Sequence, residues 1–301
     1  MNNFFEELKN AFKKRDNGLM QIITINIIVF LFINIVHLIL WLGNADALYK
    51  RVLDQFSVPA SLTSLMYRPW TLVTYLFTHE GIFHILFNML FLYWFGKIIV
   101  EYLGNKRLVN VYVLGGLIGA FFYLALYNFV PRLPLSAEMI GASGGVYAVM
   151  VAAATLRPNL TFYLLLLGPV RIKYIAGFFV LLSFIQLPQV NAGGNAAHLG
   201  GALIGYMFIS QLRKGNDLGA WITNFLGWLG GLFRRKPKMK VTYVKKEKVK
   251  SKVKVQGNGE SMSSAAPNQD EIDRILDKIS ASGYASLTKE EKQRLLDASR
   301  D

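Results

Sequence analysis

Residues 141–156 read GASGGVYAVMVAAATL, and this serine followed by small and apolar side chains decides the fold. Ser143 opens the run and Arg157-Pro158 closes it, because a proline disfavours helix in the residue before it. As a helix, residues 143–156 would cover about 20 Å of a hydrocarbon core that is about 30 Å thick. With Arg157 at one membrane face, we expect Ser143 on the order of 10 Å below the other face. The stretch therefore predicts an all-α membrane protein with a hydroxyl at depth, where polar groups seldom lack a role.

Five further apolar segments surround this stretch. With it, they predict six spans, at residues 20–42, 82–100, 108–129, 143–156, 174–187 and 196–212. The last three are shorter than the roughly 20 residues of a typical spanning helix, so they start below the surface or thin the bilayer. The apolar run 160–170 is bounded or broken by Pro158, Gly168-Pro169 and Arg171, which favours an interfacial connection.

Basic residues in the loops indicate the orientation. Lys and Arg gather before the first segment, between the second and third, between the fourth and fifth, and after the sixth. Cytoplasmic loops carry the excess of Lys and Arg, so we expect these regions and both termini in the cytoplasm. Segments two, four and six then start at the extracytoplasmic face. The amphipathic loop 43–81 is expected to lie in the outer headgroup region.

Composition divides the 301 residues into parts. A cytoplasmic segment (1–18) precedes the six-helix domain (19–212), and an amphipathic and basic juxtamembrane segment (213–256) follows it. Residues 257–269 form a linker rich in Gly, Ser and Asn, and residues 270–301 a small helical cytoplasmic tail. In the tail, the spacing of Thr288 and Glu291 predicts a capping box at a helix start.

The net charge of +14 comes largely from one region. Residues 213–254 hold 13 Lys/Arg and 2 Asp/Glu directly after the last apolar segment. Anionic headgroups attract such cations by about 1 kcal/mol each, so we expect membrane lipid, and not nucleic acid, as the partner. The chain has no cysteine, which excludes thiolate nucleophiles, disulfides and cysteine metal sites.

Ser143 and His198 are candidates for a nucleophile and its base. A serine hydroxyl is a weak nucleophile unless a neighbour takes its proton, and a neutral imidazole suits that task near pH 7. Gly201 and Gly205 form a GxxxG step below His198 that would let this helix approach the helix of Ser143. Alternatively, Ser143 is a helix cap in a packing contact and His198 a hydrogen bonder between helices.

His84 and Asn88 are four residues apart, so they share one helix face. Both donate hydrogen bonds, and beside Ser143 each would stabilise a developing oxyanion by roughly 3 kcal/mol. The pair would serve equally well as a hydrogen-bonding contact between helices. His79 is expected to be an interfacial histidine in the preceding loop.

A zinc site and a third triad member are both missing from the pattern. The H-E-x-x-H spacing of membrane metalloproteases is absent, because His79-Glu80 is followed by a histidine five positions after His79. Glu80 and Glu138 are the carboxylates near an outer helix start, and neither is close to His198 in sequence. A Ser–His dyad without a metal is the simpler interpretation.

At these residues the chain resembles the rhomboid family of intramembrane serine proteases. The matching pieces are HILFN at 84–88, GASG at 141–144 and AHLGG at 197–201 with Gly205, in that order over roughly residues 20–212. The resemblance implies Ser143 as nucleophile, His198 as base, and His84, Asn88 and the Ser143 backbone amide as oxyanion donors. It also implies no cofactor, and substrates that are transmembrane helices cut near their outer end. Arg68-Pro69-Trp70 stands where family members often carry Trp-Arg.

Two other function classes remain open beside a serine endopeptidase. A catalytically silent rhomboid-like protein would bind transmembrane clients without cutting them. A small transporter would need charged residues at mid-membrane, and the spans have almost none. Resemblance of the tail to bacterial rhomboid-like proteins suggests a bacterial inner membrane; the tail's own partner is not indicated.

Overall fold

The computed structural model describes residue 10 and residues 17–164, 168–232 and 269–298. The chain divides into two compact units, Met1–Lys236 and Pro237–Asp301. Nearly all of the expected N-terminal segment, most of the basic juxtamembrane segment and nearly all of the linker lie outside the described residues.

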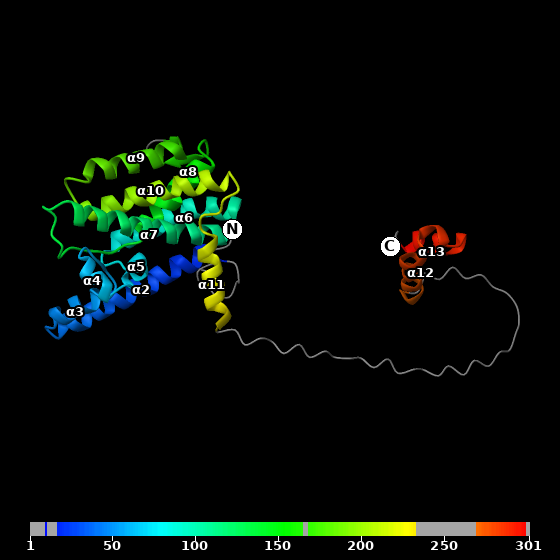
Figure 1. Cartoon of the computed structure of the whole chain (residues 1–301), viewed down its shortest axis with the longest axis horizontal. Helices are drawn as coiled ribbons and strands as arrows, with labels where there is room; N and C mark the ends of the chain where they lie inside the picture. The colour runs from blue at the N-terminus through cyan, green and yellow to red at the C-terminus, as the bar shows by residue number, and fades with distance from the viewer. Residues whose placement is uncertain (1–9, 11–16, 165–167, 233–268, 299–301) are drawn as a thin grey trace, which may run out of the picture. The chain divides into compact units, whose positions relative to one another are not determined.

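In the first unit, six helices lie at or near the six segments expected from hydropathy (Figure 1). They are α2 (Gly18–Leu42), α6 (Ile82–Leu103), α7 (Asn105–Phe129), α8 (Ser143–Leu156), α9 (Ile172–Gln186) and α10 (Ala192–Leu212). Helix α10 begins four residues earlier than predicted because Asn191 caps it, its side chain accepting a hydrogen bond from the Gly194 amide at 3.1 Å. Among the described residues, α2, α6 and α7 are long and apolar enough to cross a membrane, while α8 and α9 are shorter.

Helix α8 lies at the centre of this bundle. Helices α6, α7, α9 and α10 all contact it, and α2 packs against α6 and α7 at the edge (Figure 1). Most α8 side chains are small and buried, so its neighbours approach its backbone closely. Larger side chains fill the remaining core, among them Leu92, Phe95, Ile99, Leu108, Tyr112, Met150 and Phe208.

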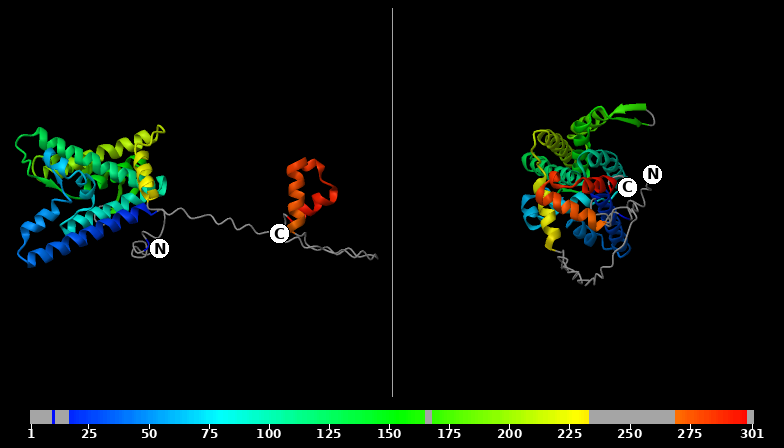
Figure 2. Two further views of the ribbon diagram at one scale, coloured as in Figure 1. Left: turned by 60° about the horizontal axis from the view of Figure 1, so that its bottom comes forward. Right: turned by 90° about the vertical axis from the view of Figure 1, so that its right-hand side faces the viewer.

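The loop between α2 and α6 is ordered as short elements. It contains α3 (Asp46–Leu53), β1 (Val58–Pro59), α4 (Leu62–Tyr67), α5 (Thr71–Thr74) and η1 (Tyr75–Phe77), which lie beside the second half of α2 (Figures 1 and 2). Strand β1 pairs antiparallel with β2 (Glu138–Met139), with Val58 opposite Met139. The loop is therefore attached to the strand that leads to Ser143.

Within the expected interfacial connection 160–170, the described residues form two short antiparallel strands in an otherwise mostly helical unit. Strand β3 (Thr161–Leu164) pairs with β4 (Gly168–Arg171), and Thr161 lies opposite Arg171. A β-branched and two aromatic residues favour a strand at 161–163, and Gly168-Pro169 cannot continue a helix. The Phe162 ring packs 5.4 Å from that of Phe95 and so attaches β3 to α6.

Among the described residues, three α-helices and one 3-10 helix follow α10. Helix α11 (Ala220–Leu232) runs across the direction of the bundle helices (Figure 1), and Asn110 of α7 donates to the Thr223 hydroxyl at 3.0 Å. The second unit contains α12 (Gln269–Ser282), η2 (Tyr284–Ser286) and α13 (Lys289–Ala298). Both bonds of the expected capping box are present: the Thr288 amide donates to the Glu291 carboxylate, and the Glu291 amide to the Thr288 hydroxyl.

Candidate active site

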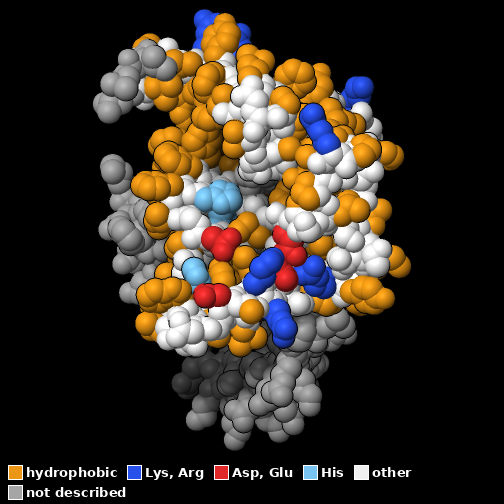
Figure 3. Space-filling view, turned by 90° about the vertical axis from the view of Figure 1, so that its left-hand side faces the viewer, with side chains coloured by type: hydrophobic (Ala, Val, Ile, Leu, Met, Phe, Trp, Pro, Cys, Tyr) orange, Lys and Arg blue, Asp and Glu red, His pale blue; other side chains and the backbone are white. Residues whose placement is uncertain are grey.

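A cavity of about 760 Å³ opens among α6, α8, α9 and α10. Its lining includes Ser143, His198, His84 and Asn88, together with aromatic side chains from α6, α7 and α9. Figure 3 shows the end of the bundle where α3 and α4 lie; acidic and basic side chains gather there beside a hollow in a largely apolar surface. A cavity that is apolar with a few converging polar groups is the usual form of a small binding or catalytic site.

Ser143 is the first residue of α8, and the loop before it is held at several points. The Gly141 amide donates to the Tyr75 carbonyl at 3.0 Å, and the Tyr123 hydroxyl donates to the Ala137 carbonyl at 2.9 Å. Gly141 has φ +123°, and a Cβ there would come within 2.8 Å of the His84 ring, so only glycine fits. This turn directs Ser143 into the cavity, at a helix start whose first amides have no partner within the helix.

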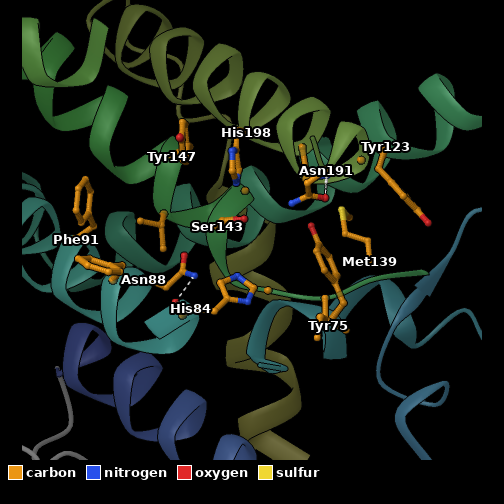
Figure 4. A pocket seen from close by; sticks show the side chains of 18 of the residues that line it. Tyr75, His84, Asn88, Phe91, Tyr123, Met139, Ser143, Tyr147, Asn191 and His198 are labelled. Atoms are coloured by element: carbon orange, nitrogen blue, oxygen red, sulfur yellow. Dashed lines mark hydrogen bonds between the residues drawn. The ribbon is translucent and has the colours of Figure 1, made fainter. Parts of the chain in front are cut away.

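His198 lies in the second turn of α10, with its imidazole directed at Ser143 (Figure 4). The Tyr147 ring stacks on it, with centroids 4.1 Å apart and an interplanar angle of 5°. The Ser183 hydroxyl of α9 lies 3.1 Å from Nδ1. Nδ1 is thus engaged on the α9 side, which leaves Nε2 for the cavity.

His84 and Asn88 face Ser143 from one side of α6 (Figure 4). Asn88 is buried, and its side-chain amide donates to the His84 carbonyl at 2.8 Å, which orients the amide group. The His84 ring lies 4.8 Å from that of His79, edge to face. A hydroxyl, an imidazole and two side chains able to donate hydrogen bonds therefore converge on one cavity, as acyl transfer requires.

Gly201 and Gly205 lie on the face of α10 that contacts α8. A Cβ at Gly201 would meet the Gly144 carbonyl oxygen, and one at Gly205 the Ala148 carbonyl oxygen, both far inside van der Waals contact. The backbones of α8 and α10 approach this closely because neither glycine has a side chain. The approach brings the start of α8 beside the His198 turn.

Glu80 and Glu138, the two carboxylates near the starts of α6 and α8, have other partners. Glu80 accepts a hydrogen bond from the Tyr49 hydroxyl at 2.7 Å. Glu138 accepts from the Ser57 hydroxyl and pairs with Arg68 at 3.4 Å. Arg68 also donates to the Asp54 carbonyl, and the Trp70 indole to that of Gln55 at 3.0 Å. Glu138 of β2 is therefore held by two residues of the loop between α2 and α6. In these contacts neither Glu80 nor Glu138 is bonded to His198, so neither completes a triad.

Sequence reasoning missed Ser183, Tyr147 and His79. A lone serine in the apolar run of α9 was the available signal for Ser183, because a hydroxyl at that depth needs a partner. His79 was expected at an interface, and that expectation was wrong: it is completely buried and accepts a hydrogen bond from the Ala142 amide at 3.3 Å. Its imidazole satisfies a backbone donor in the loop just before Ser143, which nothing local in the sequence indicates.

Among the described residues, no three His, Asp or Glu side chains gather as metal ligands. The rings of His79 and His84 meet edge to face, with centroids 4.8 Å apart. The described side chains thus offer hydrogen-bond donors and a base to this cavity, and no ligand set for a metal ion.

Comparison with known proteins gives two family matches. Residues 67–214 match the Rhomboid domain, and residues 263–301 match a family of unknown function (DUF6576). The first match contains Ser143, His198, His84 and Asn88, and the second contains α12 and α13.

Similar curated proteins are rhomboid-like proteins of organelles. RHOMBOID-like protein 12, mitochondrial, of Arabidopsis thaliana is 32% identical over 157 residues, which cover 48% of this chain and 47% of that protein. Presenilin-associated rhomboid-like protein A, mitochondrial, of Danio rerio is 34% identical over 158 residues, or 51% of this chain and 39% of that protein. Rhomboid protein 1, mitochondrial, of Saccharomyces cerevisiae is 29% identical over 147 residues, which cover 46% of this chain and 40% of that protein. The chain spans about half the length of these three relatives, or less.

Proposed function

Because this chain belongs to the rhomboid family, we propose that it is an intramembrane serine endopeptidase that cuts transmembrane helices near their extracytoplasmic end. The observation that carries this proposal is the convergence of Ser143, His198, His84 and Asn88 on one cavity. These residues come from three helices, and polar side chains at such depth are costly unless they serve a function.

The proposed reaction is acyl transfer to Ser143. The hydroxyl attacks the substrate carbonyl while Nε2 of His198 takes its proton, and the same proton then passes to the leaving amine. Donors on His84, Asn88 and the Ser143 amide stabilise the oxyanion in between. Water from the cavity hydrolyses the acyl-enzyme. A substrate helix must first unwind, because helical packing hides its carbonyl, so helix-weakening residues near the cut favour cleavage.

We further propose that all six apolar helices cross the membrane, with both termini in the cytoplasm. The short α8 and the glycine-rich α10 pack against longer neighbours, so they need not match the bilayer thickness alone. Loop charge supports this orientation, and it puts the helix starts at His84, Ser143 and His198 on the extracytoplasmic side.

The test is cleavage of a transmembrane reporter by purified protein in liposomes. We expect Ser143→Ala and His198→Ala each to lower kcat by at least about 10³-fold, because each removes an atom that takes part in proton transfer. Ser136→Ala, which changes an exposed serine in the loop before β2, serves as the matched control and should retain full activity.

Persisting cleavage by both variants would exclude this mechanism. A parent protein that binds transmembrane helices, yet neither cuts them nor reacts with a serine-directed fluorophosphonate, would instead be a silent rhomboid-like binder.

A further inference from the structure

A chain of hydrogen bonds runs from the candidate base into α9. Nδ1 of His198 lies 3.1 Å from the Ser183 hydroxyl, which lies 3.0 Å from the Tyr147 hydroxyl. The Tyr147 hydroxyl in turn lies 3.5 Å from the backbone carbonyl of Phe179. Ser183 is only 2% exposed, so these groups satisfy one another without bulk water.

The last member of this chain sets its direction. A carbonyl oxygen only accepts, so Tyr147 must donate its proton to Phe179. Tyr147 then accepts from Ser183, whose single proton is used in that bond. The Ser183 oxygen is left to accept, and the donor to it is the Nδ1 proton of His198. With its proton on Nδ1, the neutral imidazole carries a lone pair on Nε2, which faces the cavity.

We propose that Ser183 is a positioning residue that, together with Tyr147 and the Phe179 carbonyl, holds His198 in the tautomer with a free Nε2. The inference rests on the proposed function, in which Nε2 takes the proton of Ser143. Ser183 is not among the residues that line the cavity, so it acts on the reaction through the imidazole and not by contact with substrate. The Ser183 hydroxyl accepts a hydrogen bond from Nδ1–H, as the carboxylate does in a Ser-His-Asp triad. Such a partner on Nδ1 determines that Nε2 is the basic nitrogen.

Stacking adds a second restraint on the same ring. Tyr147 lies parallel to the imidazole at 4.1 Å (Figure 4), so its ring limits tilting while its hydroxyl continues the hydrogen-bond chain. Ser183 comes from α9, where the other buried side chains are Ile172 and Ala176, both nearer the start of the helix. The Ser183 hydroxyl thus connects the second half of α9 to the candidate base by a hydrogen bond to His198.

The first test reads the tautomer directly. ¹⁵N spectra of histidine-labelled protein are recorded in a Ser143→Ala background, and the His198 signals are identified by their loss in His198→Phe. We expect protonated Nδ1 and bare Nε2, a shift toward protonated Nε2 in Ser183→Ala, and the parental state in Ser183→Thr. Tyr147→Phe keeps the stacked ring but removes the acceptor of the Ser183 proton, so it should also shift the tautomer. A parental imidazole protonated on Nε2, or a tautomer unchanged by Ser183→Ala, would overturn the proposal.

The second test separates positioning from folding. In the active protein, Ser183→Ala should lower kcat by about 10- to 100-fold with KM within about twofold, and Ser183→Thr should restore kcat to within about threefold. Thr155→Val is the control, because it removes a hydroxyl that bonds the Val151 carbonyl of its own helix, α8. A full kcat in Ser183→Ala would overturn the proposal.

The two arms distinguish this inference from the proposed function. Should the parent protein lack peptidase activity, the proposed function falls, and the tautomer spectra alone decide the role of Ser183.

Discussion

His79 illustrates how much a single buried side chain does in this site. Its Nε2 accepts a hydrogen bond from the Ala142 amide, one residue before Ser143, and its ring meets that of His84 at 4.8 Å. A backbone N–H left unsatisfied in such a buried turn would cost about 1–3 kcal/mol. The imidazole must be neutral at Nε2 to accept this bond, so its protonation state is tied to the conformation of the loop.

Acidification should therefore destabilise the protein through His79. Burial, followed by the neighbouring His84, lowers the pKa of His79 from 6.5 to about 3. Between these values the unfolded chain binds a proton at His79 that the folded chain does not, so stability is fully present above pH 6.5 and falls as the pH drops toward 3. Thermal unfolding in detergent at constant ionic strength, from pH 8 to about pH 4, measures this loss.

His79→Gln is the matched variant for that measurement. Its side-chain oxygen accepts from the Ala142 amide but does not titrate in this range. We expect a smaller fall in the free energy of unfolding on acidification than in the parent. Identical pH curves for the two proteins would show that another group is responsible.

The contact between α8 and α10 is the element-level feature on which the site depends. Gly201 faces the Gly144 carbonyl, and Gly205 faces the Ala148 carbonyl. The backbones of the two helices are therefore in contact, with no side chain between them at these positions. Membrane helices associate through such packing, because lipid supplies little hydrophobic drive between them. The same contact sets the distance between the helix start at Ser143 and the His198 turn.

Adding one methyl group at this contact should separate the helices. Gly205→Ala would force its Cβ into the Ala148 backbone, and overpacking of this kind costs about 1–3 kcal/mol. We expect a lower thermal midpoint and a loss of reporter cleavage, both measured on purified protein. Gly177→Ala on α9 is the control, because nothing lies within 4 Å of its added Cβ. Equal effects of the two substitutions would argue against the helix contact as the cause.

The whole molecule joins a membrane-type unit to a small second unit with its own interior. In the second unit, Ile275 and Leu287 are buried, and Lys278 bonds the Glu291 carboxylate at 2.9 Å between α12 and α13. The cavity residues all belong to the first unit. Compact units of one chain generally fold separately, so we expect that the chemistry does not require the tail.

Removing residues 257–301 should therefore leave the first unit folded and active. We expect the thermal midpoint to stay within about 2 °C and kcat within about twofold of the full chain, because no cavity residue is lost. Leu287→Asp in the full chain is the matched control, since it disrupts the interior of the second unit without shortening the chain. A large fall in activity in both proteins would instead indicate that the tail regulates the site.

Local patterns in the chain were enough to predict the six apolar helices and four of the cavity side chains. Apolar runs report burial or lipid contact directly, and helical spacing puts His84 and Asn88 on one face whatever surrounds them. The assignment to a bacterial inner membrane stays a prediction, because apolar runs of this kind fit any bilayer.

The partners of those side chains came from packing. The hydrogen-bond partners Ser183 and His198 are 15 residues apart in sequence, and Ala142 and His79 are 63 residues apart. Each pair joins two different elements. The pairing of β1 with β2 likewise depends on which segments meet, because these strands are about 80 residues apart in sequence. The residue type determines which hydrogen bonds a side chain is able to make. The packing of helices and loops determines which partner lies within hydrogen-bond distance of it. For this reason Ser143 and His198 could be singled out from the sequence, whereas the Ser183 hydroxyl beside the His198 imidazole could not.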